Sequence, residues 1–149
     1  MPASSLYTHA VLEHYRSPRN FGELAAPTHA ADGTNPLCGD SLRIELRCEA
    51  GRVADLRFRG EACAIATATA SMLGGIAIGR SAGELAAIED RFARLIRDGA
   101  VEPDEALGEL NVMRELAHHP VRRKCALLPF ATLRAALSGA QCATTEGNT

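Results

Sequence analysis

The stretch NPLCGD, residues 35–40, places a thiol and a carboxylate two positions apart. Only Gly39 separates Cys38 from Asp40, and glycine lets the backbone turn both side chains toward one point. A thiolate and a carboxylate this close repel each other when both are ionised. Either a positive group lies between them or one of them stays protonated. The two side chains therefore raise the hypothesis of a cation site.

Two further cysteines occupy comparable positions at the edges of expected elements. Cys63 follows an expected hairpin and opens a helix, and Cys125 follows PVRRK just before the last expected helix. The positive end of a helix dipole favours the thiolate form. With Cys38 and Asp40 they would supply three sulfurs and one oxygen, enough for a tetrahedral metal site. The spacings are wide and no CxxC pair is present, so the residues alone favour the alternative of three unrelated thiols at loop ends.

The other two of the five cysteines have simpler interpretations. Cys48 falls on the inward phase of an expected strand, and a free cysteine packs as a small hydrophobic residue, so we expect it in the core. Cys142 lies in the polar tail and is interpreted as incidental. An odd number of cysteines without a secretion signal argues against a disulfide framework.

Basic and acidic residues near these cysteines are candidates for supporting roles. Arg122, Arg123 and Lys124 directly precede Cys125 and could offset the charge of three thiolates and a carboxylate. Their alternative interpretation is a solvated basic face before a helix.

Two histidines and a glutamate are weaker candidates. His118 and His119 lie close enough to Cys125 in sequence to reach a metal, but we expect them at the surface because the ligand set is complete without them. Glu61 is the carboxylate that a zinc hydrolase could use as a base near Cys63. An exposed glutamate at a strand end is the favoured interpretation.

The whole chain has the composition of one globular domain. It has 149 residues, of which 46% are hydrophobic and 23% charged, with a net charge of −2. No long basic run is present, so neither nucleic acid nor a membrane surface is expected as a partner. The first residues lack the apolar stretch of a signal peptide, which predicts a cytoplasmic protein. We expect a single domain over residues 1–138 and a disordered tail over 139–149.

The hydrophobic pattern of the first half predicts one helix followed by strands. Residues 6–16 fit a short helix that ends before Pro18. Residues 23–34 are weakly patterned and leave room for one strand. An alternating pattern then predicts a hairpin. Its expected buried positions are Leu42, Ile44, Leu46, Cys48, Ala54, Leu56 and Phe58.

The second half is predicted to be helical. The stretch CAIATATASMLGGIAIG from residue 63 is apolar or small on all sides, which is typical of a buried helix. Ser81 and Glu84 form a capping box for the next helix, which Gly99 can end. Its expected apolar stripe is Leu85, Ile88, Phe92, Leu95 and Ile96.

A helical excursion and a last helix complete the expected elements. The excursion covers about residues 100–120, and its expected anchors are Leu107, Leu110, Met113 and Leu116. The last helix is expected over residues 128–137, with Pro129 in its first turn, where the missing N–H is harmless.

Three motifs in order carry a family resemblance. NPLCGD, GEACAIATATASM and PVRRKCALL resemble the three cysteine motifs of the U-type iron–sulfur assembly proteins, which include IscU, SufU and the N-terminal part of NifU. LYTHAVLEHYRSPRNFG is similar to that family's N-terminal helix and the loop after it. The likeness covers most of residues 5–138. The expected fold is α+β, with a small antiparallel sheet of about three strands packed against helices on one side.

Two details of the resemblance point to the SufU branch. Lys124 stands where the IscU branch has a histidine before its third cysteine, and the longer gap between the second and third cysteines matches the excursion. The SufU branch carries zinc. The resemblance therefore implies a Zn²⁺ site, and the ligands that it implies are Cys38, Asp40, Cys63 and Cys125.

The function implied by this resemblance is sulfur trafficking in iron–sulfur cluster assembly. We expect a sulfurtransferase-like partner of a SufS-like cysteine desulfurase rather than a stand-alone enzyme, with Cys38 as the sulfur acceptor. Downstream iron–sulfur assembly proteins are further expected partners. The alternatives are a scaffold that builds a [2Fe–2S] cluster, or binds iron, on the same four residues, a metallohydrolase that uses Glu61, and a structural zinc module.

Overall fold

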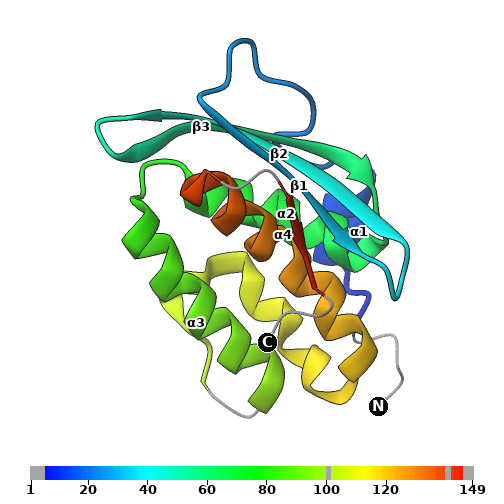
Figure 1. Ribbon diagram of the computed structural model, residues 1–149. Coiled ribbons are helices and arrows are strands. Elements are labelled where there is room, and N and C mark those ends of the chain that lie inside the picture. The colour runs from blue at the N-terminus through cyan, green and yellow to red at the C-terminus, as the bar shows by residue number, and fades with distance from the viewer. Residues whose placement is uncertain (1–5, 100–101, 140–141, 146–149) are drawn as a thin grey trace.

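A computed structural model describes residues 6–99, 102–139 and 142–145. The elements run in the order shown in Figure 1, from the N-terminal helix to a short C-terminal strand. They are α1 (His9–Arg16), β1 (His29–Asn35), β2 (Asp40–Glu49), β3 (Arg52–Glu61), α2 (Ala64–Ala77), α3 (Ala82–Asp98), the 3₁₀ segment η2 (Glu105–His118), α4 (Pro120–Ser138) and β4 (Cys142–Thr144).

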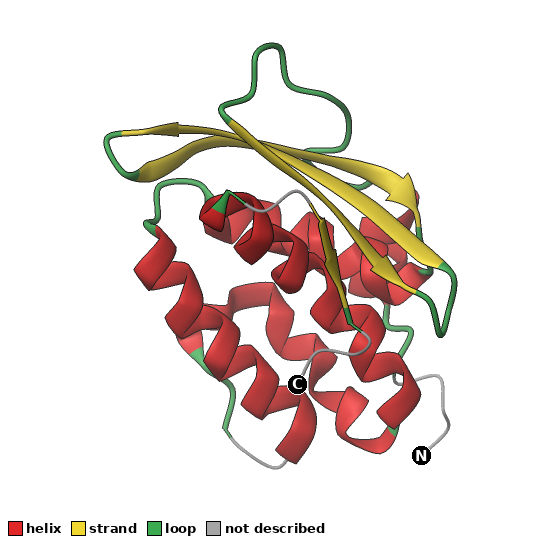
Figure 2. Ribbon diagram, viewed as in Figure 1, coloured by secondary structure: helices red, strands yellow, loops and turns green. Residues whose placement is uncertain are grey.

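The strands form one sheet in the order β3-β2-β1-β4, and the helices cover one of its faces (Figure 2). The pairs β1–β2 and β2–β3 are antiparallel, which confirms the predicted α+β fold with a three-stranded antiparallel sheet. β4 adds a short fourth strand parallel to β1. The sequence predicted a disordered tail from residue 139, and this was wrong for residues 142–144.

The β2–β3 hairpin buries most of the predicted residues but changes register next to its turn. Leu42, Ile44 and Leu46 are buried on β2, as predicted. A register shift between Arg47 and Cys48 places Cys48 opposite Val53. Val53 is buried, whereas Cys48 is only partly buried against the core. The extra residue of such a bulge explains why strict alternation misplaced this end of the hairpin.

Two helices agree closely with their sequence patterns. α2 is buried along nearly its whole length, as its lack of a polar face predicts. α3 has the predicted capping box between Ser81 and Glu84, and it ends at Gly99, whose φ of 69° is left-handed. The predicted apolar stripe of α3 is buried.

The excursion and the last helix differ in how well they were predicted. In η2 the four predicted anchors are fully buried. α4 begins at Pro120, eight residues before the predicted start at residue 128. Pro129 therefore lies inside α4, and its missing N–H removes the helical hydrogen bond to the carbonyl of Cys125. Pro120, rather than Pro129, occupies the first turn of α4.

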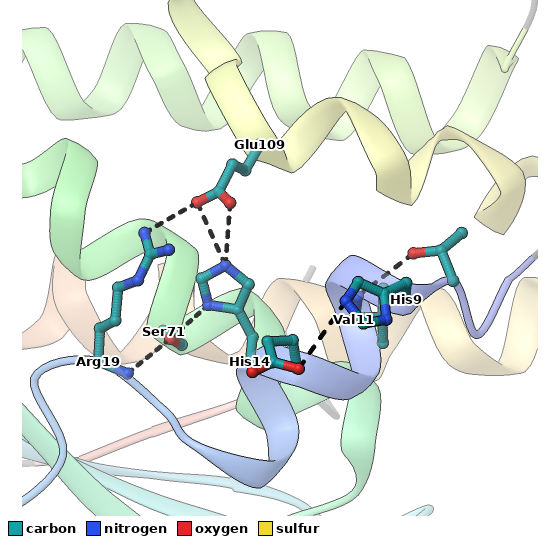
Figure 3. A network of polar contacts seen from close by, with 8 residues as sticks. His9, Val11, His14, Arg19, Ser71 and Glu109 are labelled. Atoms are coloured by element: carbon teal, nitrogen blue, oxygen red, sulfur yellow. Dashed lines mark hydrogen bonds and ion pairs between the residues drawn. The ribbon is translucent and has the colours of Figure 1, made fainter.

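A buried histidine ties the excursion to the N-terminal helix (Figure 3). His14 is 4% exposed, and its Nδ1 lies 2.6 Å from Oγ of Ser71 on α2. Its Nε2 lies 3.2 Å from both carboxylate oxygens of Glu109 on η2. Arg19 contacts the same two partners, through its N–H to Ser71 and its guanidinium to Glu109. This network holds α1, α2 and η2 together.

Of the helices in the described ranges, none combines the length and apolar character needed to cross a lipid bilayer.

Candidate metal centre

The turn between β1 and β2 carries the first two candidate ligands. The carbonyl of Asn35, the last residue of β1, accepts the N–H groups of Cys38 at 3.1 Å and Gly39 at 2.9 Å. Gly39 has a φ of 73°, a left-handed conformation that glycine adopts without strain. Asp40 begins β2 and is 3% exposed. The tight turn therefore places a half-buried thiol beside a buried carboxylate.

Cys63 comes from the N-terminus of α2, as the sequence predicted. Its sulfur accepts the N–H of Ala66 at 3.5 Å, so the thiol caps the helix. Its own N–H donates to Oδ1 of Asp40 at 2.9 Å, and its Sγ lies 3.9 Å from Oδ2. A hydrogen bond from the Cys125 thiol, together with backbone N–H groups, lowers the pKa of the Cys63 thiol to about 7. Cys63 is thus the thiol of this pair that ionises first.

Cys125 lies in the second turn of α4, not before the helix as predicted. Its side chain is fully buried and its Sγ is 3.4 Å from the Sγ of Cys38. Its hydrogen bond to Cys63, together with burial, raises the pKa of Cys125 well above its ordinary value. One potential ligand atom from each of Cys38, Asp40 and Cys125 lies within 4.8 Å of the others, so these three could bind a metal. Cys63 adjoins them through Asp40.

The three basic residues before Cys125 divide between different tasks. Nη1 of Arg122 lies 3.8 Å from the sulfur of Cys38 and 3.7 Å from that of Cys125. The hydrogen bond to Cys125 raises the pKa of Arg122 above its usual value, so the guanidinium stays charged. Arg123 instead donates to the backbone carbonyls of Leu116 and Ala117 at the end of η2. Lys124 is half-buried in the same turn of α4.

Sequence reasoning missed one buried residue of the site. Asn35 is 0% exposed, and its Nδ2 donates to Oδ2 of Asp40 at 3.3 Å and to Sγ of Cys125 at 3.6 Å. Asn35 also pairs directly with Asp40 across the β1–β2 ladder. Its place at the start of NPLCGD was a signal, because the ends of a tight hairpin turn face each other.

The weaker candidates lie at or next to the ends of elements. His118 ends η2 and is exposed, and His119 is the residue before α4. Glu61 is exposed at the end of β3, opposite Ser41. The metal-compatible group found among the described residues includes none of the three.

The donor set fits a metal that accepts sulfur. Three thiols and one carboxylate match the ligand types of tetrahedral zinc sites, and thiolates also hold iron–sulfur clusters. Three thiolates and a carboxylate carry four negative charges, and a guanidinium is the only cation among the contacts given above for the sulfurs. A divalent cation would therefore offset a strong local excess of negative charge.

Comparisons with known proteins agree with this chemistry. The profile of the NifU-like N terminal domain matches residues 6–142. The chain is 30% identical over 132 residues to the iron–sulfur cluster assembly scaffold protein IscU of Streptococcus pyogenes serotype M1, across 89% of this chain and 82% of the relative. It is also 30% identical over 129 residues to the zinc-dependent sulfurtransferase SufU of Bacillus subtilis, across 87% of each.

A solved structure has the same fold. The N-terminal NifU-like protein from Brucella abortus superposes with a TM-score of 0.83 at 24% identity, over 91% of this chain and 94% of that one. The family profile and the two relatives cover nearly all of the described residues. The chain therefore belongs to the NifU-like N-terminal domain family, the U-type iron–sulfur cluster assembly proteins.

Proposed function

We propose that this protein is a zinc-dependent sulfur acceptor that takes persulfide sulfur from a SufS-like cysteine desulfurase and stimulates it. The observation that carries the proposal is the convergence of three thiols and a carboxylate beside one guanidinium. The proposal places this exchange in the cytoplasm, where thiols stay reduced. Later iron–sulfur assembly proteins would receive the sulfur.

In this proposal Cys38, Asp40, Cys63 and Cys125 hold the metal. A bound zinc ion would favour the thiolate forms and offset their charge. Arg122 serves the same end from the protein side, because its charge lies close to two of the sulfurs. Asp40 is held at both oxygens, by the N–H of Cys63 and the amide of Asn35. The chain therefore prepares the donor atoms before any metal arrives.

Cys38 is the proposed acceptor because of its place on the β1–β2 turn. Cys125 is fully buried, whereas Cys38 is half-buried beside Leu37, which is 60% exposed. The Cys38 thiolate attacks the outer sulfur of the desulfurase persulfide. The S–S bond of the partner breaks, its electron pair returns to the partner's cysteine, and that sulfur leaves as a thiolate. Cys38 then carries the transferred sulfur as a persulfide.

The second candidate is a scaffold on which a [2Fe–2S] cluster is assembled by the same four residues. It is favoured by the equal identity to a relative named as a scaffold protein. Ligand type does not separate the two, because thiolates bind both zinc and iron–sulfur clusters.

Metal analysis of protein purified without oxygen separates the two functions. A sulfur acceptor should contain about one zinc per chain, in line with a single tetrahedral site, and should lack visible absorption. Stoichiometric iron and sulfide with a visible spectrum would favour the scaffold. Activity with a desulfurase then separates the acceptor from a structural zinc module and from a hydrolase that uses Glu61.

A further inference from the structure

The C-terminal end of the described chain reaches the metal centre through one side chain. β4 runs beside β1 (Figure 1), with Thr144 opposite Thr34. Thr145 extends this pairing, because its N–H donates to the carbonyl of Thr34 at 3.1 Å. Its Oγ1 lies 2.9 Å from Oδ1 of Asn35. Asn35 thus joins a residue far along the chain to the ligands that its amide contacts.

The surroundings of Asn35 define the orientation of its amide. Nδ2 faces Oδ2 of Asp40 at 3.3 Å and the sulfur of Cys125 at 3.6 Å. The NH₂ group of an amide donates and its oxygen accepts, so the NH₂ group faces Asp40 and the amide oxygen faces Thr145. The Thr145 hydroxyl is therefore the donor to that oxygen. Asn35 is 0% exposed, so these protein groups determine its rotamer.

We propose that Asn35 and Thr145 are a pair of positioning residues for the metal centre. Thr145 fixes the amide of Asn35, and the amide holds the carboxylate of Asp40 and the sulfur of Cys125 in place. The inference rests on the proposed function, in which Asp40 and Cys125 are metal ligands. It adds that the C-terminal segment is part of the centre. Groups that orient metal ligands in this way usually change metal affinity when they are removed.

Isosteric variants test the pair. Asn35→Leu removes the amide, Thr145→Val removes only the hydroxyl, and Thr145→Ser keeps it. Thr34→Val is the matched control, because Thr34 is an exposed threonine on β1, next to Asn35. Zinc affinity is measured by competition with a chromophoric chelator. The absorption spectrum of the Co²⁺-loaded protein reports the ligand geometry.

The expected results separate a positioning role from a general loss of structure. Asn35→Leu should weaken zinc binding about 10- to 100-fold, the range usual for such partners. Thr145→Val should weaken it by about threefold or more and shift the Co²⁺ bands, since the buried Asn35 loses one hydrogen bond. Thr145→Ser and Thr34→Val should match the parent in both measurements.

Four results would overturn the inference or its basis. Parent-like affinity and spectrum for Thr145→Val, or an equal loss for Thr34→Val, would show that the hydroxyl does not position the site. If the metal-free Asn35→Leu protein fails to melt cooperatively, the Thr145 variants alone decide whether the pair positions the metal centre. A parent protein that binds no zinc, or binds it equally well after Cys125→Ser, would instead refute the proposed metal site.

Discussion

Replacing Arg122 with glutamine should make the thiols of the metal-free protein harder to ionise. The guanidinium lies 3.8 Å from the sulfur of Cys38 and 3.7 Å from that of Cys125, and it lowers the pKa of Cys125. A hydrogen bond to a charged group contributes about 1.5–3 kcal/mol. Because Arg122 is half-exposed, solvent screening reduces this to about 1–1.5 kcal/mol. One pKa unit corresponds to about 1.4 kcal/mol, so the expected rise in the pKa of the thiols is about one unit.

The assay is the pH dependence of thiol alkylation and of thiolate absorbance in the ultraviolet. Arg123→Gln is the matched control, because Arg123 donates to the carbonyls of Leu116 and Ala117 instead of to a sulfur. Arg122→Gln should shift the profile of the Cys63–Cys125 pair to higher pH, because the guanidinium interacts favourably with the thiolates of both. Arg123→Gln should leave this profile in place. Equal profiles for the two variants would refute the role given to Arg122.

Three further predictions concern stability. Hydrogen bonds from the Leu24 N–H and from Arg59 and Arg43 lower the pKa of Glu45 to about 2. The ionised carboxylate therefore contributes fully to the free energy of unfolding above about pH 4.5, and this contribution is lost as the pH falls toward 2. In denaturant titrations Glu45→Gln should be about 1–3 kcal/mol less stable than the parent at neutral pH, and the difference should close in acid. His14→Phe should lower the free energy of unfolding by about 1–3 kcal/mol, because Ser71 and Glu109 lose their hydrogen bonds to the imidazole nitrogens. Thermal unfolding measures this, and a parent-like melting temperature would contradict it. Chelation should lower the melting temperature of the metal-loaded protein and leave its helical circular dichroism intact, because Cys125 is the only proposed ligand within a core built mainly from aliphatic and aromatic side chains of the described residues. A random-coil spectrum would contradict this prediction.

Local patterns predicted the elements whose signal is contained in a few consecutive residues. The capping box of α3, the apolar stripe of α3 and the anchors of η2 are each confirmed, because burial repeats at the helical period. α4 was wrong at its start because either of two prolines can occupy a first turn. Only packing of the first two turns against the site distinguishes Pro120 from Pro129.

Other features depend on contacts between distant residues and have no local signature. β1 was only a weak expectation, since it packs against α4 through Gly33, where any larger side chain would overlap Thr132. The motif cysteines suggested that Cys38, Cys63 and Cys125 meet. The structure groups Cys38 and Cys125 with Asp40, and Cys63 lies beside this group through its contact with Asp40. Asn35 was not predicted as a site residue because its role depends on a hydrogen bond to Cys125, which lies 90 residues away on α4.

The most direct test of the proposed function measures desulfurase stimulation by zinc-loaded Cys38→Ser protein. Alanine release by a SufS-like desulfurase is followed with the parent and the variant, and metal content is measured on the same samples. Serine cannot carry a persulfide, so stimulation should fall to the level without added protein even where zinc is bound. Full stimulation by zinc-loaded Cys38→Ser would contradict the assignment of Cys38 as the sulfur acceptor.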